Sequence, residues 1–536
     1  GQVWQIPAGG GAAGQITKHA SPVTRFELSP DGRKIAFLTI DPKGAKGTPI
    51  VIDVTDLRMY RLWVLDLDSG QEKLLTPGNY SAGGYDQWFV DTFSWSPDSR
   101  QVTFSKRPDA RAGSHLYGDV ATVSIDGADP KVVVEREGMD GHPLWAPHGN
   151  RIAFLSTGVY DWVRVSHLHV VSTADGKIRN LTGNFEDSIQ RFAWSGDGRS
   201  LYTIIGQKTA AQIFAIDAES GKMRRLTSGG GVYSQLSVSQ DGARCAFIRQ
   251  SANEPPAVYT STFPVLKPVL IARANPEALQ WTRSETSVLR WKSFDGMDIE
   301  GIVHKPVGYE KGKRYPLLVI PHGGPHGVMT NTYPAKEALL FTARGWVVFR
   351  PNFRGSGNYG ERFLRANLGG WGVGDYADVM TGVDRLIADG LVDGARMAMS
   401  GSSYGGYMTS WTIGQTDRFK AAVVGCAITN VPSFVRSTDV PRRFEDYLGT
   451  DPSVYARHSP MTYGERIKTP SLIWHGDQDA RVPLMQSREL YTQLLKNKTP
   501  VELVVYPGEV HGMHMPGYEK DLFEREWQWL EKWVMR

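Results

Sequence analysis

The strongest constraint on the fold is a strand–turn–strand pattern that recurs through the first half of the chain. Each copy has two stretches of alternating apolar and polar side chains around a tight turn rich in Pro, Asp and Gly, which is the pattern of a β-hairpin. The five copies are FELSPDGRKIAFLT (26–39), FSWSPDSRQVTFSK (93–106), PLWAPHGNRIAFLS (143–156), FAWSGDGRSLYTII (192–205) and QLSVSQDGARCAFI (235–248).

A second kind of hairpin lies between these copies, as in LWVLDLDSGQEKLLT (62–76) and IFAIDAESGKMRRLT (213–227). One repeat is therefore a four-stranded meander of about 40–50 residues, the size of a β-propeller blade. We expect five complete blades. Residues 3–17 are expected to form the outer half of a sixth, whose inner strands would precede Gly1. Either N-terminal residues are absent from this chain or the ring closes in an unusual way.

The pattern changes after about residue 285, where strand-like runs alternate with helical ones. Strand-like runs include LLVIPH, RMAMSG, SLIWHG and VELVVYP, and helical runs include YADVMTGVDRLIADG and EKDLFEREWQWLEKWV. This alternation is typical of an α/β domain with a mainly parallel sheet, in which functional sites form at the carboxyl ends of the strands. The sequence thus predicts a multidomain β plus α/β protein, with a propeller over residues 1–280 and a catalytic domain over residues 281–536.

Composition excludes several other classes of protein. The 536 residues carry a net charge of only +4 with the basic residues scattered, which disfavours nucleic acid as a partner. The sequence has no run of 18 apolar residues, so we expect no membrane span. Cys245 and Cys426 lie in apolar runs and are expected to be buried as small hydrophobic residues. A disulfide between them has no support, and two cysteines do not fix the compartment.

Ser403 is the candidate nucleophile. Gly401, Ser403 and Gly405 fit the pattern G-x-S-x-G, in which small residues flank a serine on a sharp strand-to-helix turn. The pattern is weak alone in a chain with 58 glycines, but here the strand-like MAMS precedes the serine and the helical YGGYMTSWTIGQT follows it. Its context is therefore that of a nucleophile in an α/β-hydrolase.

A serine nucleophile needs a base and an acid that orients the base, and α/β-hydrolases place these after the serine in the order acid, then histidine. The strand-like SLIWHG opens into a loop with Asp477 and Asp479, and VELVVYP opens into a loop with His511 and His514. The residues alone leave the choice within each pair open. Each side chain has an ordinary alternative role in shaping its loop.

Donors for an oxyanion are expected from the strand-like LLVIPH and the glycines that follow it in HGGP (322–325). Glycine lets backbone N–H groups approach a substrate closely. The N–H of Tyr404, directly after the nucleophile, would be the other donor.

These residues resemble the prolyl oligopeptidase family of serine peptidases, in particular its acylaminoacyl-peptidase and bacterial dipeptidyl-peptidase branch. The resemblance covers most of the last 240 residues. The matching motifs are HGGP (322–325), PNFRGSGNYG (351–360), WGVGDYADV (371–379), GSSYGGY (401–407), HGDQDARVP (475–483) and GEVHG (508–512). The family fold that it implies is an N-terminal β-propeller followed by a C-terminal α/β-hydrolase domain.

The resemblance also implies roles for single residues. Ser403 would be the nucleophile, Asp479 the acid and His511 the base, since the family pattern is HGxxDxxVP. Gly324 and Tyr404 would form the oxyanion hole. Arg481 would bind a backbone carbonyl of the substrate, a role that suits the fixed donors of a guanidinium. Four apolar residues would line the primary specificity pocket: Ile428, Val431, Phe434 and Val482.

Two departures from the family are visible. Ser402 stands where family members usually carry Gly or Trp. The chain also lacks the Glu-Glu pair that grips a free amino terminus in the best-known dipeptidyl peptidases. The acidic residues of the propeller that remain as candidates are Glu137, Asp140, Asp161 and Glu186.

We therefore expect a serine peptidase that hydrolyses short oligopeptides through an acyl-enzyme and releases dipeptides or acylated amino acids, with no metal and no organic cofactor. An oligopeptide endopeptidase, a carboxylesterase and a propeller interaction module with an inert hydrolase half are the alternatives. Self-association is left open. The family occurs both in cytosol and in periplasm, so the compartment stays open, with a slight lean toward a bacterial exported enzyme.

Overall fold

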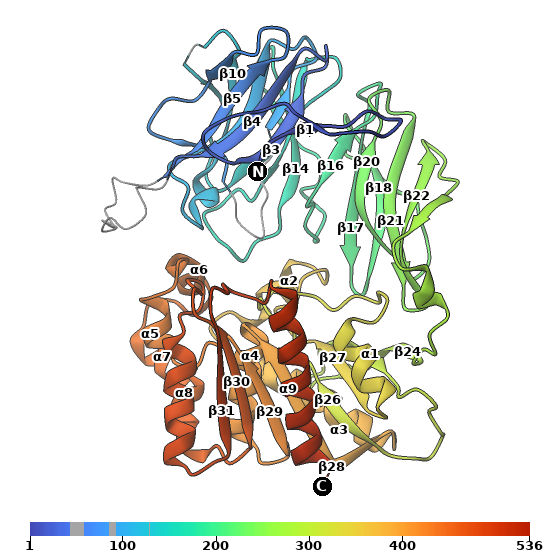
Figure 1. The fold of residues 1–536 in the computed structure, drawn as a ribbon, viewed down its shortest axis with the longest axis vertical. Coiled ribbons are helices and arrows are strands. Elements are labelled where there is room, and N and C mark those ends of the chain that lie inside the picture. Colours follow the sequence, from blue (N-terminus) through green and yellow to red (C-terminus); the bar gives the residue numbers. More distant parts are fainter. Residues whose placement is uncertain (43–57, 85–92, 128, 536) are drawn as a thin grey trace.

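The two expected kinds of domain lie one above the other in the computed structural model, which describes residues 1–42, 58–84, 93–127 and 129–535. The strands of the propeller, coloured blue to green in Figure 1, lie above a sheet flanked by helices, coloured yellow to red. The predicted boundary at residue 280 falls between the last propeller strand, β23 (Val269–Arg273), and the first strand of the lower sheet, β24 (Thr286–Lys292).

Among the described residues of this domain, mainly antiparallel strands form four sheets besides the N-terminal hairpin, and we divide them into five blades. Blades 1 and 2 contain β3 (Val23–Leu28), β4 (Lys34–Ile40), β5 (Tyr60–Asp66), β6 (Glu72–Leu74), β7 (Ser81–Ala82), β8 (Phe93–Trp95), β9 (Gln101–Arg107), β10 (Asp119–Ser124) and β11 (Lys131–Val134). Blade 3 contains β12 (Asp140–Trp145), β13 (Arg151–Ser156), β14 (His167–Ser172) and β15 (Ile178–Asn180). Blades 4 and 5 contain β16 (Phe192–Trp194), β17 (Ser200–Gln207), β18 (Ala210–Asp217), β19 (Met223–Arg225), β20 (Val232–Val238), β21 (Arg244–Ser251), β22 (Glu254–Thr262) and β23.

The segment expected to form half a blade is a two-stranded antiparallel hairpin of β1 (Trp4–Gln5) and β2 (Gly14–Gln15). Two short 3-10 helices complete the described elements of this domain, η1 (Ser114–Tyr117) and η2 (Pro276–Leu279). Blades 4 and 5 are joined by a single parallel bridge between Ala211 and Val232.

A repeated side-chain hydrogen bond explains the Ser-x-Asp sequence of the blade turns. The Ser29 hydroxyl donates to Asp31 Oδ1 at 2.6 Å, and the same carboxylate oxygen accepts from the backbone N–H of Arg33 at 3.0 Å. The pairs Ser96–Asp98, Ser195–Asp197 and Ser239–Asp241 repeat the serine bond at 2.6 Å. An aspartate that binds the backbone two residues on stabilises a tight turn. The hairpins of these four blades are thus set by local chemistry.

The catalytic domain contains an eight-stranded sheet in the order β24-β25-β27-β26-β28-β29-β30-β31. Pairing from β27 to β31 is parallel, whereas β24 and β25 add antiparallel strands at one edge, a hairpin that the sequence analysis did not predict. The remaining strands are β25 (Asp298–His304), β26 (Tyr315–Val319), β27 (Val347–Asn352), β28 (Val392–Ser402), β29 (Ala421–Gly425), β30 (Ser471–Gly476) and β31 (Val501–Tyr506).

Helices cover both faces of this sheet, which explains why β26 and β29 are apolar throughout. One face packs against α1 and α9, and the other against α3, α4 and α8. The helices are α1 (Lys336–Ala343), α2 (Glu361–Leu364), α3 (Gly374–Ala388), α4 (Tyr404–Gln415), α5 (Val431–Val435), α6 (Pro441–Leu448), α7 (Pro452–Arg457), α8 (Met485–Lys496) and α9 (Pro516–Val534), with the 3-10 helices η3 (Arg365–Asn367) and η4 (Pro460–Arg466).

Loops at the carboxyl ends of the parallel strands face the propeller. Arg365 binds Asp161 of blade 3 with 2.5 Å between Nη1 and Oδ2. The N–H of Gly360 donates to Asp187 Oδ1 at 2.9 Å, and the N–H of Trp162 donates to Asp446 Oδ2 at 3.2 Å. In Figure 1, α2 and α6 accordingly lie at the upper edge of the catalytic domain. The propeller therefore covers the edge at which α/β sites form.

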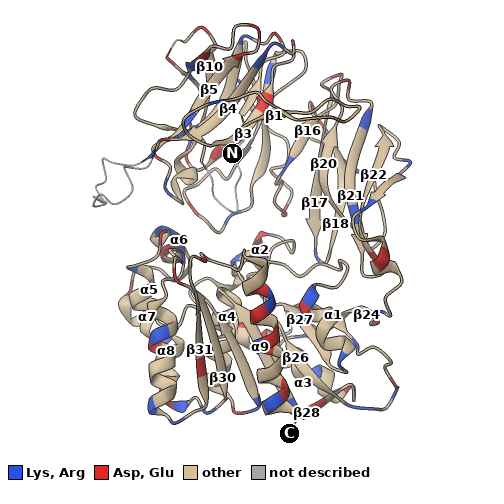
Figure 2. Cartoon of the chain, viewed as in Figure 1, with Lys and Arg blue, Asp and Glu red and all other residues tan. Residues whose placement is uncertain are grey.

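The distribution of charge, the hydropathy of the helices and the state of the two cysteines are further features of the described residues. Figure 2 shows Lys and Arg interspersed with Asp and Glu over both domains. Among the described residues, no helix has the length and hydropathy that a membrane span needs. Cys245 and Cys426 are both buried and both free thiols.

A buried ion pair fixes the loop after β27, in the PNFRGSGNYG motif. Arg354 donates from Nε and Nη2 to the two carboxylate oxygens of Asp378 at 2.9 and 2.8 Å, and Asp378 is fully buried on α3. Asp378 also accepts from the hydroxyl of Ser293. This network ties the loop, α3 and the β24–β25 hairpin together.

Replacing Arg354 by Ala leaves the carboxylate of Asp378 buried without its cation. We expect a loss of about 3–5 kcal/mol in the free energy of unfolding, measured by urea denaturation. The matched control is Arg385→Ala, because the Arg385–Asp389 pair has side chains 52% and 42% exposed. That variant should lose at most about 1 kcal/mol. Equal losses in the two variants would contradict the structural role assigned to Arg354.

Candidate active site

Ser403 occupies a sharp turn between β28 and α4, with φ 59° and ψ −123°. This conformation is rare for a residue with a side chain and is typical of a nucleophile elbow. The two flanking glycines leave no room for a side chain. A Cβ on Gly401 would lie 2.4 Å from the carbonyl oxygen of Gly405. A Cβ on Gly405 would lie 2.4 Å from the carbonyl oxygen of Pro321. The G-x-S-x-G pattern is therefore a packing requirement at this turn.

His511 and Asp479 come together with Ser403. His511 Nε2 lies 2.9 Å from Ser403 Oγ, and His511 Nδ1 lies 2.7 Å from Asp479 Oδ2. Because the carboxylate can only accept, Nδ1–H donates to Asp479, which leaves Nε2 to accept from the serine hydroxyl. The three loops that supply these residues follow β28, β30 and β31. This is the geometry of a nucleophile, a base and an orienting acid.

The structure brings Asp479 and His511, rather than Asp477 and His514, to the serine. Asp477 Oδ1 accepts from the N–H of Gly508 at 2.7 Å, which ties the loop after β30 to the loop after β31. The side chain of His514 is 65% exposed and lies beside Glu509, with 3.1 Å between Nδ1 and Oε2. Both residues have the ordinary loop-shaping role.

The buried acid is held in its charged form. Asp479 Oδ1 accepts backbone N–H bonds from Arg481 and Val482, each at 2.9 Å. Burial opposes the charge, but hydrogen bonds from His475 and His511 outweigh it and hold the pKa of Asp479 at about 2. Burial likewise opposes the protonated form of His511, whereas the hydrogen bond to the Asp479 carboxylate favours it. The site is thus built to stabilise an imidazolium.

The HGGP loop lies directly against the serine. A Cβ on Gly323 would lie 3.4 Å from Ser403 Cβ, which is van der Waals contact with the serine. Gly324 has φ +129°, and its carbonyl oxygen accepts from Arg443 Nη2 at 2.9 Å. The N–H of Tyr404 belongs to the first turn of α4, where N–H groups have no partner within the helix. Both predicted oxyanion donors therefore lie in segments that border Ser403.

The buried carboxyl group of Asp375 holds the residue that directly follows Ser403. The hydroxyl of Tyr404 donates to Asp375 Oδ2, and both side chains are fully buried. Burial raises the pKa of Asp375 to about 7, although the hydrogen bond from Tyr404 lowers it. Trp371 packs edge-on against Tyr404 with 4.8 Å between ring centroids. Trp371 and Asp375 belong to the WGVGDYADV motif, to which sequence reasoning assigned no structural role.

Arg481 and the predicted pocket residues lie near these loops. The guanidinium of Arg481 is held by Asp439, with 2.6 Å between Nε and Oδ1. The four apolar residues proposed for the specificity pocket are almost fully buried in the core cluster beside α4: Ile428, Val431, Phe434 and Val482. Their role as a pocket stays a prediction.

The acidic candidates of the propeller differ in their surroundings. Arg136 binds the fully buried Asp140 with 2.7 Å between Nη2 and Oδ1, and Asp161 binds Arg365. Glu137 and Glu186 are exposed. The two more buried carboxylates thus already have arginine partners.

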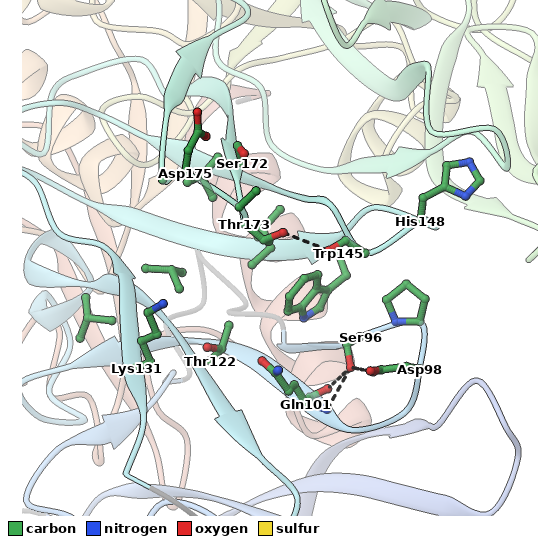
Figure 3. A pocket seen from close by; sticks show the side chains of 18 residues that line it. Ser96, Asp98, Gln101, Thr122, Lys131, Trp145, His148, Ser172, Thr173 and Asp175 are labelled. Carbon is green, nitrogen blue, oxygen red and sulfur yellow. Dashed lines mark hydrogen bonds between the residues drawn. The ribbon is translucent and has the colours of Figure 1, made fainter.

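A cavity of about 780 Å³ lies between blades 2 and 3 (Figure 3). Its wall includes Ser96, which donates to Asp98, and none of the residues around Ser403. Thr122 and Lys131 come from β10 and β11, and Trp145 from β12. The side chains of this cavity belong to blade turns and strands.

Comparison with known proteins agrees with both domains. The profile of the prolyl oligopeptidase family matches residues 331–536, and that of the TolB beta propeller domain matches residues 50–262. Residues 331–536 are therefore a domain of the prolyl oligopeptidase family of serine peptidases. The resemblance and the fold class expected from the sequence are therefore confirmed.

Relatives within this family carry different names. The chain is 31% identical over 342 residues to the uncharacterized peptidase YuxL of Bacillus subtilis, across 63% of this chain and 52% of that protein, about half its length. It is 25% identical to dipeptidyl-peptidase 5 of Porphyromonas gingivalis across 96% of this chain and 80% of that one. A solved acylaminoacyl peptidase superimposes with a TM-score of 0.85 at 19% identity, across 99% of this chain and 85% of the other.

Replacing Asp375 by Asn should change how stability depends on pH. The pKa of Asp375 is about 7 in the folded protein, above its ordinary value of 3.8, so its contribution to stability is present at low pH and lost as pH rises through 7. Asn keeps an acceptor for Tyr404 and does not ionise. We expect the Tm of the variant, relative to wild type, to rise by several degrees from pH 4 to pH 8 in thermal scans.

The control for this experiment is Asp298→Asn, because the side chain of Asp298 is 82% exposed. Its Tm should follow that of wild type at each pH. A constant difference between Asp375→Asn and wild type from pH 4 to pH 8 would contradict the proposed ionisation of Asp375.

Proposed function

We propose that this chain is a serine exopeptidase that cleaves short oligopeptides through an acyl-enzyme and releases an acylated amino acid from their amino end. The proposal rests on two hydrogen bonds made by His511. Its Nε2 lies 2.9 Å from Ser403 Oγ, and its Nδ1 lies 2.7 Å from Asp479 Oδ2. An active enzyme is favoured over an inert interaction module, because Ser403, His511 and Asp479 are all present and lie within hydrogen-bonding distance.

The proposed chemistry follows from these contacts. Ser403 Oγ attacks the scissile carbonyl carbon while His511 Nε2 takes its proton, and the C–N bond breaks as Nε2 returns that proton to the leaving amine. Water then attacks the ester by the same route, with His511 again as base. Asp479 keeps the imidazole in the required tautomer and stabilises its protonated form.

Backbone donors would stabilise the oxyanion of each tetrahedral intermediate. We assign this role to the N–H groups of Tyr404 and Gly324. Two features support the assignment, the position of Tyr404 at the first turn of α4 and the close packing of Gly323 on Ser403. Arg443, which binds the carbonyl of Gly324, would hold that loop in place.

The surroundings of the two more buried propeller acids favour a blocked amino end over a free one. A free ammonium group needs an unpaired carboxylate, yet Asp140 and Asp161 are already bound by Arg136 and Arg365. The other two candidates, Glu137 and Glu186, are exposed to solvent. An acylated amino end carries no charge and needs no such partner. The acylaminoacyl peptidase that shares the fold was solved with a blocked peptide ketone, Z-Gly-Gly-Phe-chloromethyl ketone.

The propeller would restrict the enzyme to short, unfolded peptides. It covers the loops around Ser403, and a cavity of about 370 Å³ lies between the domains, lined by Gln190 and Tyr233 of the propeller and by Val328 and Asn358 of the catalytic domain. A folded protein exceeds such a space. We propose that Arg481 binds a substrate carbonyl and that Ile428, Val431, Phe434 and Val482 accept an apolar side chain.

A panel of chromogenic substrates tests the proposal. It compares N-acetylated amino acids, free-amine dipeptides, blocked longer peptides and a small aryl ester, each with wild type and with Ser403→Ala. We expect the N-acetylated amino acids to give the highest kcat/KM, and Ser403→Ala to lose activity by about 10⁴-fold or more. Turnover confined to free-amine dipeptides would identify dipeptidyl release instead. Equal rates in wild type and Ser403→Ala would rule out the peptidase.

Arg481→Ala tests the proposed carbonyl contact. A lost hydrogen bond to a charged donor should lower kcat/KM for acylated peptides by about 10- to 100-fold. Hydrolysis of a small aryl ester, which has no such carbonyl, should change little. Steady-state kinetics on both substrates separates these outcomes, and Asp439→Asn is the control for loss of the ion pair alone. A parallel fall on both substrates would contradict a binding role for Arg481.

A further inference from the structure

A thiol lies beside the base and the acid of the proposed site. Three possible ligand atoms lie within 4.8 Å of one another: the thiol sulfur of Cys426, a carboxylate oxygen of Asp479 and a ring nitrogen of His511. The three residues follow three adjacent strands of the sheet, β29, β30 and β31. From the sequence, Cys426 was expected only as a buried apolar residue. Its proximity to Asp479 could not be predicted, because the two residues are 53 positions apart.

The backbone holds Cys426 firmly in this place. Its N–H donates to the carbonyl oxygen of Trp474 at 2.9 Å, and its φ of +30° is unusual for a residue with a side chain. Its residue exposure is only 2%, whereas the side chain of His511 is 15% exposed. The thiol is therefore almost closed to solvent, and the neighbouring His511 is the more accessible of the two side chains.

The three donors suit a borderline-soft divalent cation. Zn²⁺ is bound by Cys sulfur at about 2.3 Å and by His nitrogen and carboxylate oxygen at about 2.0–2.2 Å, with an open fourth position for water. Tetrahedral bonds of that length place ligand atoms about 3.3–3.8 Å apart. Small side-chain shifts would bring the three atoms to such separations. A thiolate and a carboxylate would balance the two positive charges.

We propose that Cys426, His511 and Asp479 form an inhibitory site for Zn²⁺ and cations of similar chemistry. On binding, the thiol releases its proton to solvent, and the sulfur, one ring nitrogen and one carboxylate oxygen become ligands. The inhibition rests on the proposed peptidase function, whereas the binding itself does not.

Metal binding by His511 is incompatible with its hydrogen bonds to Ser403 and Asp479. If the metal takes His511 Nε2, that nitrogen can no longer accept the proton of Ser403, which lies 2.9 Å away in the metal-free protein. If the metal takes Nδ1, the N–H that donates to Asp479 is lost, together with the orientation of the ring. Either arrangement removes the base. The metal should therefore inhibit hydrolysis.

Variants of the two cysteines distinguish zinc bound at this site from zinc bound elsewhere on the protein. Hydrolysis of the best chromogenic substrate is measured against Zn²⁺ concentration, and each protein is scaled to its own metal-free rate. We expect Cys426→Ala and Cys426→Ser to need about tenfold or more Zn²⁺ for the same inhibition, the size of a lost ligand. Cys245→Ala is the matched control, because Cys245 lies buried in blade 5, and it should keep wild-type sensitivity. A chelator should restore the wild-type rate.

Co²⁺ gives a readout that is independent of activity. Wild type and Cys245→Ala should show a thiolate-to-cobalt charge-transfer band in the near ultraviolet, and both Cys426 variants should lack it. Absence of the band in wild type, or its persistence in folded Cys426→Ser, would overturn the proposal. Equal zinc inhibition of wild type and both Cys426 variants would overturn it as well. If the chain hydrolyses no substrate, the cobalt band still tests the binding site.

Discussion

The turn at Ser403 is the constraint on which the rest of the catalytic domain depends. Its φ of 59° forces the side chain out of the line of β28, and the contacts of Gly401 with Gly405 and of Gly405 with Pro321 leave no room for a Cβ. Once this turn is formed, the HGGP loop must pass beside the serine, and α4 must begin directly after it. The buried hydrogen bond from Tyr404 to Asp375 anchors that first helical residue from below.

The parallel sheet supplies the rest of the geometry. Because β28 to β31 are adjacent and parallel, their carboxyl-end loops meet at one edge, and residues as distant as Ser403 and His511 come within hydrogen-bonding distance. The same principle brings Cys426 to the same place, which is the basis of the proposed metal site. The propeller covers this edge through contacts such as that of Arg365 with Asp161.

Local chemistry explains which parts were predictable from sequence. The blade hairpins depend on Ser-x-Asp turns that bind their own backbone, so the propeller could be predicted without knowing any distant contact. The alternating strands and helices, and the glycines around Ser403, are local in the same way. The choice between Asp477 and Asp479, or between His511 and His514, depends on loops that meet only in the fold, and sequence supported it only through a family resemblance. The β24–β25 hairpin and the position of Cys426 were missed because they depend on pairing across the sheet.

The central claim is that Ser403 is the nucleophile that His511 activates, and covalent labelling tests it most directly. The protein is treated with a fluorophosphonate that reacts with activated serines, and the labelled peptide is identified by mass spectrometry. We expect one adduct, on Ser403 in the peptide containing GSSYGGY, and loss of labelling in His511→Ala. An adduct on another serine, or unchanged labelling of His511→Ala, would contradict the claim.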